Sequence, residues 1–116
     1  MTDSKNNHSF RHHFDHERLD VYRVAVSVAR DVRRARWPRG TAHLKDNALR
    51  GAESMVLNIA EGAGRGPGAA RDNHFRLARG SAAETCAVLD CLDLRTTASL
   101  QTRLRRIGAM LTALLR

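Results

Sequence analysis

The amino-acid sequence predicts an all-α protein, an antiparallel up-down-up-down four-helix bundle. Apolar residues recur at three- and four-residue spacing in four segments, which is the period of a helix with one buried face. The 116 residues are enough for one domain with a bundle core. Because there are only three Phe, one Tyr and one Trp, Leu, Val, Ile, Ala and Met must build that core, and these suit helix packing better than a β-sandwich.

The chain divides into two parts. Residues 1–13 carry almost no apolar content and no periodicity, so we expect a flexible N-terminal arm. Residues 14–116 are expected to form the four-helix bundle domain. Its first helix is predicted from about Asp15, a possible N-cap, to about Arg36. The segment 37–40 (Trp-Pro-Arg-Gly) ends it, because a residue before proline is disfavoured in the α region.

The second helix is predicted over about residues 41–61, with Thr41 as its N-cap. One stripe of it carries small or polar residues at helical spacing, opposite an apolar face. The members of the stripe are Asn47, Gly51, Ser54, Asn58 and Glu61. Such a stripe allows a close helix contact, either inside the bundle or between subunits, and the sequence leaves both alternatives open.

The segment from Gly62 to Gly68 is the clearest break, and Gly62 is predicted to stop the second helix. A phosphate-binding loop is disfavoured, because the segment lacks Gly-Lys-Ser/Thr and follows a helix instead of a strand. We therefore predict a plain interhelical turn. The third helix is expected over about residues 69–94 and the fourth over about 98–115, each with an apolar seam at three-four spacing. The third helix's seam is Phe75, Ala78, Ala82, Thr85, Leu89 and Leu92, and the fourth helix's seam is Leu100, Leu104, Ile107, Leu111 and Leu114.

The second and third helices carry the motif Leu49-Arg50-x-Ala52-x-Ser54-Met55-x-x-Asn58-Ile59-Ala60-Glu61-Gly62, followed by Arg65 and by Ala78-Arg79-Gly80-Ser81-x-x-Glu84. This motif resembles the four-helix bundle proteins encoded in 23S rRNA intervening sequences. The resemblance covers roughly residues 14 to 115 and includes Leu19-Asp20-Val21-Tyr22 and Ile107-Gly108-x-Met110-Leu111. Departures from the family pattern are Trp37 for a usual Phe, Gly51 where Arg or Ala is common, and Arg95-Thr96-Thr97 for a Gly-containing turn.

That resemblance implies a homo-oligomer, commonly a pentameric ring. It also implies a distant similarity to the accessory proteins of diversity-generating retroelements, which bind reverse transcriptase and nucleic acid. Candidate residues for helix contact or for an oligomer interface are the small or charged members of the motif: Ser54, Asn58, Glu61, Gly80, Ser81 and Glu84.

The net charge of +8, with 20 basic against 12 acidic residues, favours a polyanionic or acidic partner. The alternative is a solvated surface on an Arg-rich chain. The basic residues fall in stripes, and Arg103, Arg105 and Arg106 cluster on the fourth helix. Arginine suits phosphate because its planar guanidinium bonds two oxygens at once. The candidate nucleic-acid-binding residues are Lys45, Arg50, Arg65, Arg71, Arg76 and Arg79.

No Ser-His-Asp, paired-acid or Cys-His arrangement stands out, so we expect no enzyme and no cofactor. The histidines of His12-His13-x-x-His16 predict only adventitious metal affinity. Cys86 and Cys91, five apart on one helix, point to different sides and cannot bridge each other, and free thiols fit a reducing compartment. No apolar run reaches membrane-spanning length, so a cytoplasmic protein without membrane contact is expected.

Together these observations favour a non-enzymatic, homo-oligomeric helical bundle that binds RNA or DNA backbone through a basic face. The alternative from another class is a protein–protein adaptor with an acidic partner, such as a reverse transcriptase or a ribosome-associated factor.

Overall fold

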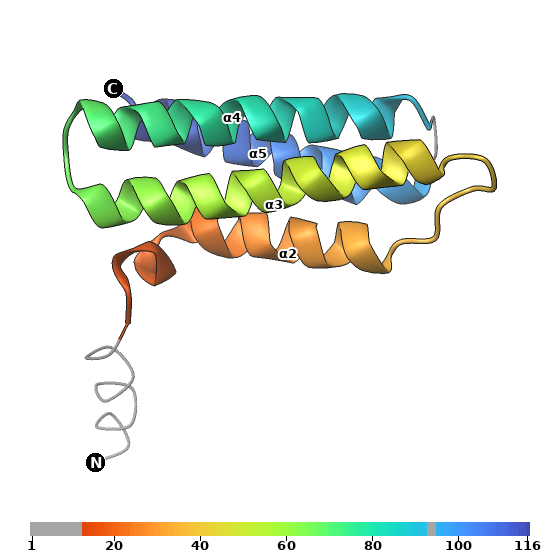
Figure 1. Cartoon of the computed structure of the whole chain (residues 1–116), viewed down its shortest axis with the longest axis horizontal. Helices are drawn as coiled ribbons and strands as arrows, with labels where there is room; N and C mark the ends of the chain where they lie inside the picture. Colours follow the sequence, from red (N-terminus) through yellow and green to blue (C-terminus); the bar gives the residue numbers. More distant parts are fainter. Residues whose placement is uncertain (1–12, 93–94) are drawn as a thin grey trace, which may run out of the picture.

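A computed structural model describes residues 13–92 and 95–116 of the chain. Its elements are η1 (Asp15–Arg18), α2 (Asp20–Arg34), α3 (Ala42–Arg65), α4 (Ala69–Asp90), η2 (Arg95–Thr97) and α5 (Ala98–Leu114). The four long helices lie side by side and alternate in direction (Figure 1). Each packs on its neighbour in the sequence, and α2 also packs on α5, which closes the bundle. The predicted antiparallel four-helix bundle is therefore confirmed.

The first predicted helix is divided and ends earlier than expected. Asp15 begins a single 3-10 turn, which Glu17 closes by accepting a hydrogen bond from the backbone N–H of Phe14 at 2.7 Å. Leu19 is extended, and α2 begins only at Asp20. The helix ends at Arg34 because Ala35 is extended and the Trp37 indole folds back to donate to the carbonyl of Val32 at 3.3 Å.

Thr41 occupies the predicted N-cap position of α3, but its hydroxyl does not cap the helix. The hydroxyl donates instead to the carbonyl of Pro38, within the preceding turn. Because that donation orients the side chain toward the turn, the first free N–H groups of α3 receive no side-chain cap.

The prediction that Gly62 stops the second helix is wrong, because α3 continues to Arg65. Gly62 is buried where α3 passes the ring of Phe75, and a Cβ there would lie 2.7 Å from Phe75 Cε1. The missing side chain at Gly62 therefore lets α3 pack closely on Phe75, and Gly62 forms no turn. The turn itself is made by Gly66 and Gly68, whose φ angles of 74° and 144° are ones that side chains disfavour.

The last helix of the bundle, α5, matches its predicted bounds within one residue. The third long helix, α4, ends at Asp90, before the predicted residue 94. Residues 93 and 94, and most of the predicted N-terminal arm, lie outside the described residues.

The core consists of small and medium aliphatic side chains around one phenylalanine. Its fully buried members include Val28, Val32, Met55, Ile59, Phe75, Leu89, Leu104, Ile107 and Leu111.

Candidate nucleic-acid interface and the seam between α3 and α4

The small polar stripe of α3 contacts α4 within the same chain. The hydroxyl oxygens of Ser54 and Ser81 lie 3.0 Å apart. The Asn58 amide donates to the Ser54 carbonyl at 2.9 Å, and its oxygen lies 3.0 Å from Nδ1 of His74. These residues are half-buried. For Ser54, Asn58 and Ser81 the structure therefore shows the contact inside the bundle, and we name them, with His74, the polar seam.

Glycine allows the two helices to approach closely at both ends of this seam. A Cβ at Gly51 would lie 2.4 Å from the Thr85 hydroxyl, and Gly62 faces Phe75 and the Arg71 carbonyl. The departure from the family pattern at Gly51 thus has a local cause, since the buried Thr85 occupies the space that a side chain would need. His74 was not among the predicted contact residues, although its spacing from Ser81 would have placed it on the same face.

The other predicted contact residues lie outside this seam. Glu61 forms an ion pair with Arg65 at 2.8 Å, and both side chains are about half exposed. Glu84 is exposed, and a Cβ at Gly80 would meet no atom within 4 Å. These three residues therefore have surface positions, where they are accessible to a second molecule.

The six predicted nucleic-acid-binding residues are not equally available. Arg65 is paired with Glu61. Arg71 is partly buried, lies 3.0 Å from the Asp72 carboxylate, donates to the Leu114 carbonyl, and stacks over the Phe75 ring. Its guanidinium joins the ends of α4 and α5, so it has little capacity left for a phosphate. Among the described residues, no ion pair involves the remaining four: Lys45, Arg50, Arg76 and Arg79.

Arg76, Arg79 and Arg105 lie along the surface where α4 meets α5, and we name them the arginine track. Arg79 donates to the Thr112 hydroxyl at 3.1 Å, which places it on the α5 side of α4. Arg79 and Arg105 line one groove of about 330 Å³, whose floor includes small residues such as Ala83 and Gly108. Arg76 is exposed, three residues before Arg79 on the same side of α4.

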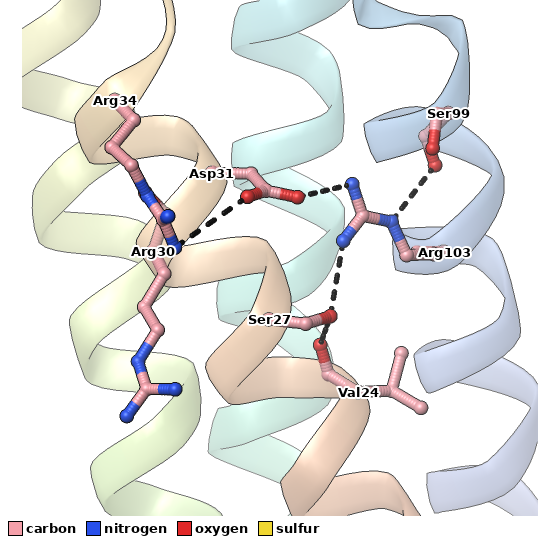
Figure 2. A network of polar contacts seen from close by, with 7 residues as sticks. All are labelled: Val24, Ser27, Arg30, Asp31, Arg34, Ser99 and Arg103. Atoms are coloured by element: carbon pink, nitrogen blue, oxygen red, sulfur yellow. Dashed lines mark hydrogen bonds and ion pairs between the residues drawn. The ribbon is translucent and has the colours of Figure 1, made fainter.

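The predicted arginine cluster of the last helix is separated by the fold. Figure 2 shows Arg103 directed toward α2, where it pairs with Asp31 at 2.9 Å and donates to the hydroxyl of Ser27 at 3.0 Å. Arg105 lines the groove with α4 instead. Residues two apart on a helix point about 200° from each other, so the run of arginines in the sequence could not have formed one patch.

Asp31 forms ion pairs with two arginines. Its Oδ2 pairs with Arg103 of α5, and its Oδ1 lies 3.9 Å from Arg34 of its own helix. In Figure 2, the side chain of Arg30 extends away from Asp31, while the Arg30 backbone carbonyl accepts a hydrogen bond from Arg34 at 3.4 Å. The pair of Arg103 with Asp31 therefore joins α2 to α5 and is structural in character.

The two cysteines are free thiols, Cys86 half-buried and Cys91 exposed. Burial raises the pKa of the Cys86 thiol, the Asp90 carboxylate raises that pKa further, and Arg105 opposes both effects. Since the thiolate is the reactive form, the raised pKa lowers the reactivity of the Cys86 thiol.

We expect Cys91 to be alkylated by iodoacetamide at least several-fold faster than Cys86 at pH 7.5, because Cys91 is exposed, whereas Cys86 is half-buried and has a raised pKa. Mass spectrometry of timed digests measures both rates in one sample, and denatured protein gives the reference. Equal rates in the folded protein would contradict the position of Cys86 in the α4/α5 groove.

In the part of the chain that the structure describes, no three His, Cys, Asp or Glu side chains come together as metal ligands. His12, one of the three predicted adventitious ligands, lies outside that part. No helix among the described residues has the length and apolar content that crossing a membrane requires.

Comparison with known proteins gives one family. Residues 17–113 match the model of the 23S rRNA-intervening sequence protein family. Comparisons with curated proteins and with solved structures give no match. The matched segment spans α2 to α5 and includes both the polar seam and the arginine track. With most of its length matched and the expected four-helix architecture, the chain belongs to the 23S rRNA-intervening sequence protein family.

Proposed function

We propose that this protein is a non-enzymatic, self-associating cytoplasmic bundle that binds the phosphate backbone of RNA or DNA through the arginine track. The observation that carries this proposal is that Arg79 and Arg105 line the α4/α5 groove, that Arg76 is exposed one turn before Arg79, and that none of the three has an ion pair among the described residues. Elsewhere in the bundle, Arg23, Arg33 and Arg65 are each paired with a carboxylate. Arg30 and Arg50 also have no ion pair among the described residues, but they belong to α2 and α3 and do not line this groove.

The register of α4 against α5 sets the length of the track. Arg79 bonds to Thr112, and Gln101 donates to Asp90, so Arg105 lies opposite residue 86 of α4. Arg76 is ten residues from that position, which corresponds to about 15 Å along a helix. Duplex DNA carries one charge for about every 1.7 Å of its axis, so a track of this length covers several phosphates.

Two acids lie beside the track. Asp72 is paired with Arg71, whereas Asp90 accepts a hydrogen bond from the neutral amide of Gln101 and keeps its negative charge at the Arg105 end of the groove. The small residues on the groove floor let a sugar-phosphate backbone come close to the helices. The residues that line the groove include no aromatic side chain on which a base could stack. Binding should therefore tolerate many sequences and depend strongly on salt.

We expect the double variant Arg76→Glu with Arg79→Glu to lose nucleic-acid affinity by roughly tenfold or more at low salt, because two phosphate contacts become repulsive. The slope of log K against log salt should fall by about two units. Fluorescence titrations of labelled structured RNA and duplex DNA across a salt series measure both quantities.

The matched control is Arg36→Glu with Arg39→Glu, which makes the same charge change at two exposed arginines between α2 and α3. We expect this control to lose much less affinity than the track variant. Equal losses in the two variants would show that only net charge matters and would refute the track. If the unaltered protein binds neither nucleic acid at low salt, the proposal fails and an acidic protein partner becomes the leading explanation of the basic surface.

A further inference from the structure

An apolar groove runs between α2 and α3, which lie side by side (Figure 1). The groove has a volume of about 350 Å³, and the apolar residues that line it are Val26, Ala29, Val56 and Leu57. Leu57 is 67% exposed, although it lies in the middle of a long helix, and the other three are half-buried. An aliphatic side chain that entered the groove would remove all four from water, which is favourable.

The length of the groove corresponds to two turns of a helix. The ion pair between Arg33 and Glu53, 2.7 Å long, lies at one end and sets the register of the two antiparallel helices. Counting from this pair, Arg30 lies at the height of Val56, and Val26 lies one turn further along. The seven residues from Val26 to Arg33 span about 10 Å along the helix axis. A partner helix that lay along the groove could therefore direct side chains one turn apart into it.

One charge of the groove has no counterpart in the chain. Arg33 and Glu53 neutralise each other. The side chain of Arg30 has no ion pair among the described residues, and the neighbouring Asp31 already pairs with two other arginines. Arg30 is exposed at the edge of an otherwise apolar groove. A carboxylate of a partner is the group that would satisfy it.

The balance of charge favours a different protein as the occupant. A second copy of this chain has a net charge of +8, so it would add positive charge beside Arg30. A nucleic acid would satisfy Arg30, but its phosphate backbone has no aliphatic group to cover Leu57. Beyond the Arg33 end of the groove, Arg50 and Asp46 of α3 carry opposite charges one turn apart, so they leave the balance unchanged.

We propose that the groove between α2 and α3 binds an acidic amphipathic helix of another protein. An aliphatic side chain of that helix packs against Val56 and Leu57, and a carboxylate one turn away pairs with Arg30. In such interfaces the apolar anchor supplies most of the affinity, and the charge selects the partner. The groove shares no residue with the arginine track of α4 and α5, so one chain could hold this helix and a nucleic acid together.

Selection from displayed helical peptides of about 18 residues, randomised along one face among Leu, Ala, Glu, Lys and Gln, tests the chemistry of the partner on the full-length protein. We expect the enriched peptides to carry leucine one turn from glutamate. Fluorescence anisotropy should show that they bind Leu57→Ala roughly tenfold more weakly than the unaltered protein, because the anchor loses its contact. Leu57 and Arg30 are exposed, so variants at both positions should fold, and circular dichroism checks this.

A charge exchange tests the role of Arg30. An enriched peptide should bind Arg30→Glu roughly tenfold more weakly than the unaltered protein. When the glutamates of the peptide are replaced one at a time by lysine, one replacement should restore binding to Arg30→Glu while it weakens binding to the unaltered protein. Arg39→Glu is the matched control, since it makes the same charge change at an exposed arginine outside the groove, and it should change the affinity little.

The proposal is overturned if no peptide is enriched, or if the enriched peptides bind Leu57→Ala and Arg30→Glu as tightly as the unaltered protein. A change of sedimentation mass in Leu57→Ala would assign the groove to a contact between copies of this chain, and a loss of duplex-DNA affinity in that variant would assign it to nucleic acid. Arg76→Glu with Arg79→Glu should weaken peptide binding much less than Arg30→Glu does. The opposite order would place the peptide on the arginine track and overturn the proposal.

Discussion

Replacing Phe75 with alanine should lower the free energy of unfolding by about 3–5 kcal/mol, the largest effect that we expect from one substitution. Phe75 is 2% exposed and is the only phenylalanine in the described core. Its ring fills the space that Gly62 leaves on α3, and the Arg71 guanidinium covers it with its carbon 5.5 Å from the ring centroid. Truncation leaves a cavity between α3 and α4 and removes the support of Arg71.

Urea unfolding followed by circular dichroism measures this loss, at one fixed protein concentration because self-association would couple to stability. Phe14→Ala is the matched control, since the same atoms are removed from a ring that is 71% exposed. We expect the control to change stability by less than about 1 kcal/mol. Similar losses in the two variants would contradict the burial of Phe75.

Most of the fold could be predicted from the sequence, because amphipathic periodicity determines which helix faces are buried. The residues of the predicted seams, such as Ala78, Leu104 and Ile107, are buried as expected. The helix ends were harder to predict, since they depend on tertiary contacts. Gly62 reads as a helix stop in the sequence, but packing against Phe75 gives it a position inside α3.

The candidate site could be predicted only in part. The periodicity identified the small stripe of α3 but could not decide whether Ser54 would face another helix or another subunit. That choice depends on which helix lies beside the stripe. In the structure this helix is α4, because Ser81 of α4 contacts Ser54. The list of basic residues was less accurate, because local spacing does not reveal which arginines find a carboxylate or a carbonyl, as Arg71 does.

Replacing Gly51 with alanine should destabilise the protein by about 1–3 kcal/mol, although alanine favours a helix interior by about 1 kcal/mol over glycine. The added Cβ would lie 2.4 Å from the hydroxyl oxygen of Thr85. That hydroxyl is fully buried and donates to the Ser81 carbonyl at 2.8 Å, so it cannot move without breaking a buried hydrogen bond. Urea unfolding gives the loss, and Gly108→Ala is the control, because a Cβ at that helical glycine meets no atom within 4 Å.

A double-mutant cycle with Thr85→Ala separates the steric conflict from every other effect of Gly51→Ala. Without the Thr85 hydroxyl, the new methyl group would meet only the Ser81 carbonyl at 3.5 Å and the Cβ of residue 85 at 3.7 Å, which are ordinary contacts. The helix preference of alanine should then dominate, so in the Thr85→Ala background the same substitution should stabilise the protein by up to about 1 kcal/mol. We expect Gly108→Ala to stabilise the protein. If Gly51→Ala also stabilised it with Thr85 intact, then α3 and α4 could not approach as closely as the polar seam requires. A reversal of sign between the two backgrounds would instead locate the closest approach of the helices at this one pair.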